Sequence, residues 1–392
     1  MVRLLLTIAI IVISVPMFSQ NLLYETMQQG SYEVGFCDTL LIDDTRSYEQ
    51  FGYSGGAPFF VKIWHPIKEG EGNYLNYNEF RTKPDLTELK EVYQQLVMNM
   101  DSAFTWYNVE TDFVKYEDIN YKNKTAYEVK DFIIENTQTI SRFKEIDINK
   151  GDFPVIFYHH GAQGLADENY LMAEFFASHG YIFVSSNFHW PFEGKSYGYN
   201  TDYNYNIRGA QFMSDFVQDL AADQKSFFIG HSWGAQTGFS VLFEDLGYEA
   251  FVSMETTLEY YDSPKIKKVW PKLDSIMRLR KEDYELPMLL FANSGKASEF
   301  DFRFFQLINN AKMCHLSYKE EFGHESYTGI YLLRYLYKKQ FKEPDNRAVK
   351  KQLEGYFKHL NVIKQFIESD HQKATLLDGF SKDFYIKTYN YN

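Results

Sequence analysis

The chain has 392 residues, of which 45% are hydrophobic and 18% aromatic, so it can bury a large core as one domain or two. Its formal net charge is −13, and it has no run rich in lysine and arginine. Nucleic acid and anionic membrane surfaces are therefore not expected as partners.

The first residues have the pattern of a secretory signal peptide. A short positive start at residues 1–3 is followed by an apolar run over residues 4–15, and the small Ser19 precedes the expected cleavage point. The run is shorter than the roughly 20 residues that a membrane-spanning helix needs. We therefore expect residues 1–19 to be removed and the mature chain to be exported, to the periplasm or outside the cell, with no stable membrane span.

Only two cysteines, Cys37 and Cys314, are present. Export permits one disulfide, and the sequence leaves open whether the two residues pair or stay as separate thiols. The histidines are scattered, and no cluster of cysteine and histidine has the spacing of a zinc site. Neither a metal nor another cofactor is expected.

The segment before residue 150 divides into two parts. Residues 30–66 predict opening strands, at 34–36, 40–42 and 59–66, with a turn at 43–46. Residues 70–150 interrupt the strand series and predict helices at 84–100 and 126–143. We interpret this part as an inserted helical cap beside the core, and packing on the edge of the sheet is the alternative.

From residue 153 the chain alternates between strands and helices. Strands are predicted at 153–158, 181–186, 226–229, 250–254, 288–291 and 314–318, and helices at 169–179, 207–220, after residue 234 through 243, 327–340 and 347–367. Apolar strands separated by helices indicate a parallel sheet that is covered on both faces. Residues 20–392 are thus expected to form one α/β domain, with a C-terminal helical extension at about 341–392.

Residues 230–234 (GHSWG) have the pattern of a nucleophile elbow. They follow the apolar strand predicted at 226–229 and open a helix of small residues. In this context G-x-S-x-G exposes a serine on a sharp turn, and the glycines avoid collisions with the neighbouring strand and helix. The pattern predicts Ser232 as a catalytic nucleophile, and a structural glycine-rich turn is the alternative.

A serine nucleophile needs a base and an acid that orients the base. In this architecture both come after the serine in the chain, the histidine last. His324 follows the last predicted strand and is the expected base, with an exposed loop histidine as the alternative. The acid is expected to be Glu255, directly after the strand 250–254, or else Asp301 or Glu299 in the next loop.

Two backbone N–H groups are expected to form an oxyanion hole. One belongs to Trp233, after the nucleophile, and the other to Ala162, in the turn 159–164 (HHGAQG), where His160 is expected to brace the backbone. The aromatic residues that follow the strand 181–186 suggest a substrate pocket, although aromatic stretches also form cores. The candidate pocket residues are Trp190, Tyr197 and Tyr199.

Several motifs together resemble the platelet-activating factor acetylhydrolase-like branch of the α/β-hydrolases, which is related to dienelactone hydrolase-like proteins. These motifs are residues 34–35 (VG), 44–46 (DTR), 62–66 (KIWHP), 160–162 (HGA) and 230–234 (GHSWG). The resemblance covers about residues 30–66 and 153–337. It implies an α/β-hydrolase fold, ester hydrolysis without a cofactor, and an acid at position 255, where that branch usually has aspartate.

The expected function is that of a secreted serine hydrolase that cleaves carboxylic esters through an acyl-enzyme. Its substrate is expected to be a small-molecule, lipid or glycan ester. Two alternatives are a peptidase or amidase on the same fold, and a catalytically inactive binding protein. The oligomeric state is left open.

Overall fold

The computed structural model describes residues 23–24, 26–69, 72–83, 86–110, 124–146, 153–162, 165–194, 203–292, 302–308, 310–338, 346–369, 371, 375 and 377–390. The signal peptide predicted at residues 1–19 lies outside them. None of the described helices is long and apolar enough to cross a membrane.

The described strands form one eleven-stranded sheet in the order β11-β10-β9-β8-β7-β5-β6-β2-β1-β4-β3. Their bounds are β1 Glu33–Gln50, β2 Tyr53–Ile67, β3 Tyr74–Asn76, β4 Gln138–Phe143, β5 Val155–His159, β6 Ile182–Ser185, β7 Ser226–His231, β8 Ala250–Met254, β9 Met288–Ala292, β10 Met313–Tyr318 and β11 Phe384–Tyr389. Strands β5 to β10 pair in parallel, whereas β2 joins β6 and β11 joins β10 in antiparallel fashion. The predicted parallel sheet is therefore confirmed.

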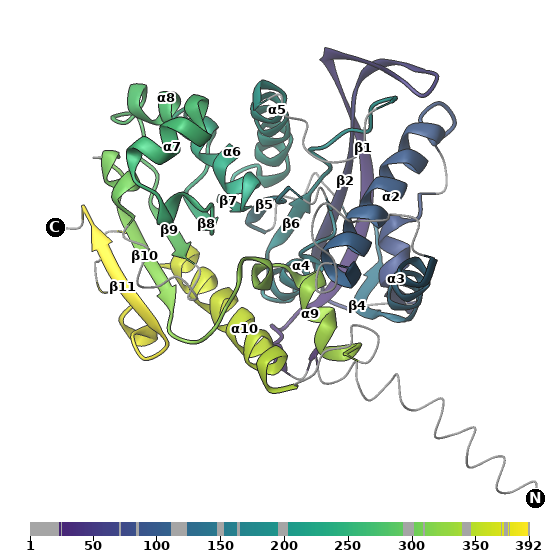
Figure 1. The fold of residues 1–392 in the computed structure, drawn as a ribbon. Coiled ribbons are helices and arrows are strands. Elements are labelled where there is room, and N and C mark those ends of the chain that lie inside the picture. The colour runs from purple at the N-terminus through teal and green to yellow at the C-terminus, as the bar shows by residue number, and fades with distance from the viewer. Residues whose placement is uncertain are drawn as a thin grey trace, which may run out of the picture.

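Helices cover both faces of the sheet. On one face α4 (Tyr170–Ser178), α9 (Gly329–Leu336) and α10 (Asn346–Glu368) pack against one another, and on the other α5 (Tyr203–Ala221), α6 (Trp233–Val241) and α8 (Pro271–Leu279) do so (Figure 1). The short helix α7 (Ser263–Val269) precedes α8 and contacts it. This layering follows from the sequence, because strands that are apolar on both sides need helices on both sides.

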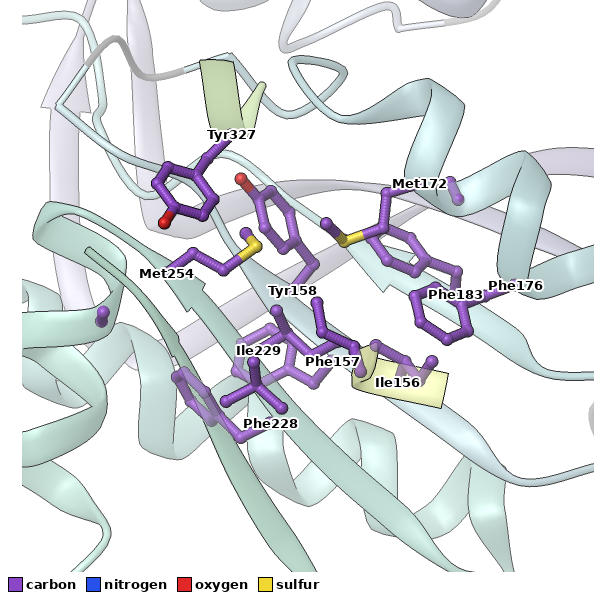
Figure 2. Close-up of a cluster of buried hydrophobic side chains, with 14 of the residues drawn as sticks. Ile156, Phe157, Tyr158, Met172, Phe176, Phe183, Phe228, Ile229, Met254 and Tyr327 are labelled. Atoms are coloured by element: carbon purple, nitrogen blue, oxygen red, sulfur yellow. The ribbon is translucent and has the colours of Figure 1, made fainter. Parts of the chain in front are cut away.

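The core is built on the central strands (Figure 2). The register pairs Phe157 of β5 with Phe228 of β7, and their rings meet edge to face with centroids 5.0 Å apart. The next residue, Tyr158, faces the other way and stacks on Phe183 of β6 at 5.5 Å. Each buried aromatic side chain stabilises the fold by roughly 1.5–3 kcal/mol. The central strands are therefore a firm support for the loops that follow their carboxyl ends.

The opening strands are longer than predicted. The segments 34–36 and 40–42 belong to one strand, β1, which pairs with β2 as a hairpin. The turn predicted at 43–46 is wrong, because these residues form a shift in register within the hairpin. There Arg46 Nε lies 2.5 Å from Asp43 Oδ2 in a buried ion pair, which satisfies the two charges inside the sheet.

The inserted segment, residues 72–146, contributes both helices and strands. It contains the 3₁₀ helix η1 (Tyr77–Arg81), α2 (Lys90–Phe104), the π-helical turn η2 (Thr105–Glu110) and α3 (Lys124–Asn136). The helix predicted over 126–143 ends early, since Thr137 donates from both N and Oγ1 to the Ile133 carbonyl and β4 begins directly after it. Strand β4 pairs with β1 and β3, so the segment extends the sheet at its edge.

The two cysteines lie on strands near opposite edges of the sheet. Cys37 is on β1 and Cys314 on β10, and both are buried free thiols. Burial raises the pKa of the Cys37 thiol to about 12, which makes it unreactive.

We therefore expect that reduction leaves the mass of the intact protein unchanged. A thiol-alkylating reagent should add nothing to the folded chain and two groups after unfolding without reductant, because both thiols are then exposed. Mass spectrometry checks this result. Alkylation that requires prior reduction would show that the two residues are paired.

Candidate active site

Ser232 sits on the turn between β7 and α6, where it is the N-cap of the helix. Its backbone has a positive φ, with φ 51° and ψ −113°, outside the regions that non-glycine residues normally occupy. A non-glycine residue adopts such a conformation only when the surroundings enforce it. Here the Ser232 N–H donates to the Met254 carbonyl of the neighbouring strand β8 at 3.1 Å, which ties the turn to the sheet.

The two glycines of the motif are both required by close backbone approaches. A Cβ atom on Gly230 would fall 2.5 Å from the Ala235 nitrogen, and one on Gly234 would overlap the His159 carbonyl at the end of β5. Both contacts involve backbone atoms, which cannot swing aside. The helix thus packs directly on the strand ends, as expected for a nucleophile elbow.

His324 is brought to Ser232 by the loop that follows β10. It is the first residue of the 3₁₀ helix η7 (His324–Tyr327), and its Nε2 lies 2.9 Å from Ser232 Oγ. The side chain is 28% exposed, so the site is open to solvent on one side. A serine hydroxyl at this distance can donate its proton to the imidazole.

Glu255 lies on the other side of the imidazole. Its Oε2 lies against His324 Nδ1, and the carboxylate is 1% exposed. Because a carboxylate accepts hydrogen bonds, Nδ1 carries the proton and Nε2 is left free to accept one from Ser232. The three predicted residues therefore form one continuous chain of contacts.

The turn after β8, which contains Glu255, has a strained backbone like that of the nucleophile elbow. Glu255 and Thr257 both have positive φ, 51° and 70°. Between them, Thr256 donates from N and Oγ1 to the buried carboxylate of Glu259 at 2.9–3.1 Å, and its carbonyl accepts from Gln236 Nε2 at 2.8 Å. Burial raises the pKa of Glu259 to about 7.

Burial also acts on the base. It lowers the pKa of His324 below that of a free histidine, and the nearby His231 acts in the same direction. The imidazole is therefore neutral near pH 7, which is the form that can take a proton.

The turn after β5 lies against the elbow and contains the predicted oxyanion donor Ala162. The tautomer of His160 is fixed there, because its Nε2 accepts from the Phe188 N–H at 3.0 Å and its Nδ1 must then donate to the Gly161 carbonyl at 2.8 Å. That carbonyl belongs to the peptide whose N–H is that of Ala162, so His160 fixes its plane. His189 adjoins His160, with ring centroids 5.1 Å apart.

Of the three candidate pocket residues, the structure describes Trp190. Trp190 is 4% exposed, and its indole donates to the Pro58 carbonyl at 2.6 Å while its ring packs on Phe59. It thus joins β2 to the chain after β6. Tyr197, Tyr199 and the alternative acids Asp301 and Glu299 lie outside the described residues.

Sequence reasoning missed two side chains beneath the site. Glu168 is fully buried and accepts from the Gly161 N–H at 3.0 Å. His231, the residue before the nucleophile, donates from Nε2 to the His324 carbonyl at 3.2 Å. Glu168 belongs to no recognisable motif, whereas His231 stands at a variable position of the GHSWG motif, where the pattern specifies no residue type.

No metal cluster is found in the part of the chain that the structure describes. No protein-family model matches the sequence, and no curated protein is significantly similar to it. Among solved structures, a ferulic acid esterase from Streptomyces cinnamoneus is similar, with a TM-score of 0.52, 12% identity, and coverage of 86% of this chain and 91% of that one.

Two further structures superpose too loosely to bear on the fold. They are Est1E from Butyrivibrio proteoclasticus (TM-score 0.32, 14% identity, 44% and 83% coverage of this chain and that one) and dienelactone hydrolase from Anabaena variabilis (0.33, 13%, 54% and 88%). The order of the strands, the elbow and the first match together define an α/β-hydrolase fold.

We predict that His160→Phe lowers the free energy of unfolding by about 2 kcal/mol or more, because it leaves a buried N–H and a buried carbonyl unpaired. Chemical denaturation measures the change. His315→Phe is the matched control, since neither ring nitrogen of that buried histidine has a hydrogen-bond partner among the residues that the structure describes. The control should keep or gain stability, and equal losses in both variants would contradict the role of His160.

Proposed function

We propose that the protein is a serine hydrolase that cleaves carboxylic esters through an acyl-enzyme. The observation that carries the proposal is the contact of Ser232 Oγ with His324 Nε2 at 2.9 Å, with the Glu255 carboxylate on Nδ1. This is the arrangement that converts a weakly nucleophilic hydroxyl into an attacking group.

In the first half of the reaction, Ser232 Oγ attacks the ester carbonyl while His324 Nε2 takes the hydroxyl proton. The C–O bond to the alcohol then breaks, and the imidazolium gives that proton to the leaving alkoxide oxygen. Glu255 holds the ring in place and stabilises its positive charge. In the second half, His324 takes a proton from water while the water oxygen attacks the acyl carbon. The bond from that carbon to Ser232 Oγ then breaks, which releases the acid, and the imidazolium returns its proton to Ser232 Oγ.

The backbone N–H groups of Ala162 and Trp233 are the donors that stabilise the negative charge that develops on the carbonyl oxygen during the attack. Trp233 is the first residue of α6, where backbone N–H groups point out of the helix and the helix dipole favours negative charge. Each such donor contributes about 3–4 kcal/mol at the transition state. No step requires a cofactor.

The nature of the ester and the location of the enzyme are part of the same proposal. The candidate substrates are acetyl, lipid and glycan esters, and the name of the structural neighbour from Streptomyces adds aromatic acyl esters. Residues 1–19 support export, so the substrate would be met in the periplasm or outside the cell.

The proposal predicts that residues 20–392 hydrolyse one or more of the p-nitrophenyl esters from acetyl to decanoyl, or a feruloyl ester. Ser232→Ala should lower kcat by about 10⁶-fold, because the covalent route is lost. Turnover is followed as release of p-nitrophenol or of ferulate. If both proteins are folded and neither exceeds buffer on any ester, the assignment is wrong.

A second prediction concerns pH. The base must be neutral, so kcat/KM falls as the pH drops through the pKa of His324 in the free enzyme. Since burial lowers this pKa, the acidic limb should lie below about pH 6.5, the value of an unperturbed histidine. A limb at pH 7 or above would contradict the lowered pKa of His324.

A further inference from the structure

Glu168 connects three parts of the candidate site. Its Oε1 accepts from the Gly161 N–H at 3.0 Å and from the Tyr158 hydroxyl at 2.6 Å. The same oxygen lies 3.6 Å from Nδ1 of His231, and the Glu168 carbonyl accepts from the Ile330 N–H at 2.9 Å. One buried residue therefore touches the oxyanion turn, the elbow and the chain just after His324.

The path from Glu168 to the base has one intermediate side chain. His231 is fully buried and donates from Nε2 to the His324 carbonyl, while its Nδ1 lies 3.6 Å from Glu168 Oε1, in packing contact and beyond hydrogen-bond distance. A displacement of the Glu168 carboxylate would move the Gly161 peptide through a hydrogen bond, and it would change the packing of the His231 ring that holds the His324 carbonyl. Neither contact reaches the substrate, so Glu168 is a positioning residue.

The inserted segment holds the neighbour of Glu168 in the chain. Arg81, at the end of η1, places Nε 2.6 Å from Asp167 Oδ2 and Nη1 2.6 Å from Asp101 Oδ1. Asp101 pairs in turn with Lys130 at 2.7 Å. The Arg81–Asp167 pair is almost completely buried, the two side chains being 2% and 0% exposed.

Neighbouring positive charges keep the buried Asp167 carboxylate ionised. Burial by itself would raise the pKa of Asp167, but Arg81 and Lys62 hold it below the usual value, so the residue stays charged. A buried ion pair often adds little net stability, whereas removal of one partner strands a charge and forces the structure to rearrange. The rearrangement would begin at Asp167, next to Glu168.

We propose that the inserted segment braces the oxyanion turn and the catalytic histidine through the Arg81–Asp167 ion pair, with Glu168 as the residue that transmits the constraint. This inference rests on the proposed function. It gives the segment a role in catalysis rather than one in stability alone, because oxyanion donors and base must be placed to within a fraction of an ångström.

The test compares Arg81→Met with a control in the same segment. Thr137→Val removes a hydroxyl of the segment that contacts the Ile133 carbonyl (2.7 Å) and Tyr337 (3.1 Å), and neither contact involves Arg81 or Glu168 directly. Arg81→Met should lower kcat about 10- to 100-fold with KM within about twofold. Thr137→Val should leave both within about twofold even where it lowers the melting temperature.

A conservative pair of variants separates positioning from packing. Glu168→Gln keeps an oxygen that accepts from Gly161 and Tyr158, whereas Glu168→Met has a similar shape and no acceptor. The glutamine variant should therefore retain at least about tenfold more kcat than the methionine variant. Equal losses in these two variants would overturn the role of Glu168.

Hydrogen exchange gives a readout that does not need turnover. The backbone amides of residues 155–162 should exchange faster in Arg81→Met than in wild type. In Thr137→Val their exchange rates should equal those of wild type. If wild type hydrolyses no ester but Arg81→Met still exchanges faster at residues 155–162, the proposed function is wrong and the proposed role of the Arg81–Asp167 pair is supported. If wild type is active while Arg81→Met matches it in kcat and in exchange, or if Thr137→Val loses kcat equally, the brace is wrong.

Discussion

The strained backbone at Ser232 is the constraint on which the site depends. A positive φ of this kind costs a non-glycine residue of the order of 1–3 kcal/mol, so it persists only where packing on all sides enforces it. Here α6 approaches the end of β5 so closely that Gly230 and Gly234 admit no side chain, and the Met254 carbonyl holds the Ser232 N–H. The core drawn in Figure 2 supplies the rigidity beneath.

The register of the sheet explains why nucleophile and acid meet. Strands β7 and β8 are parallel neighbours, and His231 pairs with Met254. The next residues, Ser232 and Glu255, therefore follow the carboxyl ends of two adjacent strands. Adjacent strands lie about 4.8 Å apart in an ideal sheet. Both turn with positive φ, and the imidazole of His324 fits between them.

Much of this could be predicted from the sequence, since the elbow, the catalytic order and the strand ends are local patterns. The predictions that failed were those that depend on distant contacts. Four polar residues at 43–46 look like a turn, yet the chain on either side of them stays paired with β2, with Asp43 opposite Ala57 and Ser47 opposite Gly56. Glu168 carries no motif, because its role arises only when β5, β7 and the chain after β10 come together.

Covalent labelling tests the central claim, that Ser232 is an activated nucleophile, most directly and without knowledge of the substrate. Purified residues 20–392 are treated with a fluorophosphonate, digested, and the modified peptide is located by mass spectrometry. The geometry predicts a single adduct on Ser232 that disappears when the protein is unfolded beforehand or when His324 is replaced by alanine. A folded protein that takes no label, or that is labelled at another residue, would contradict it.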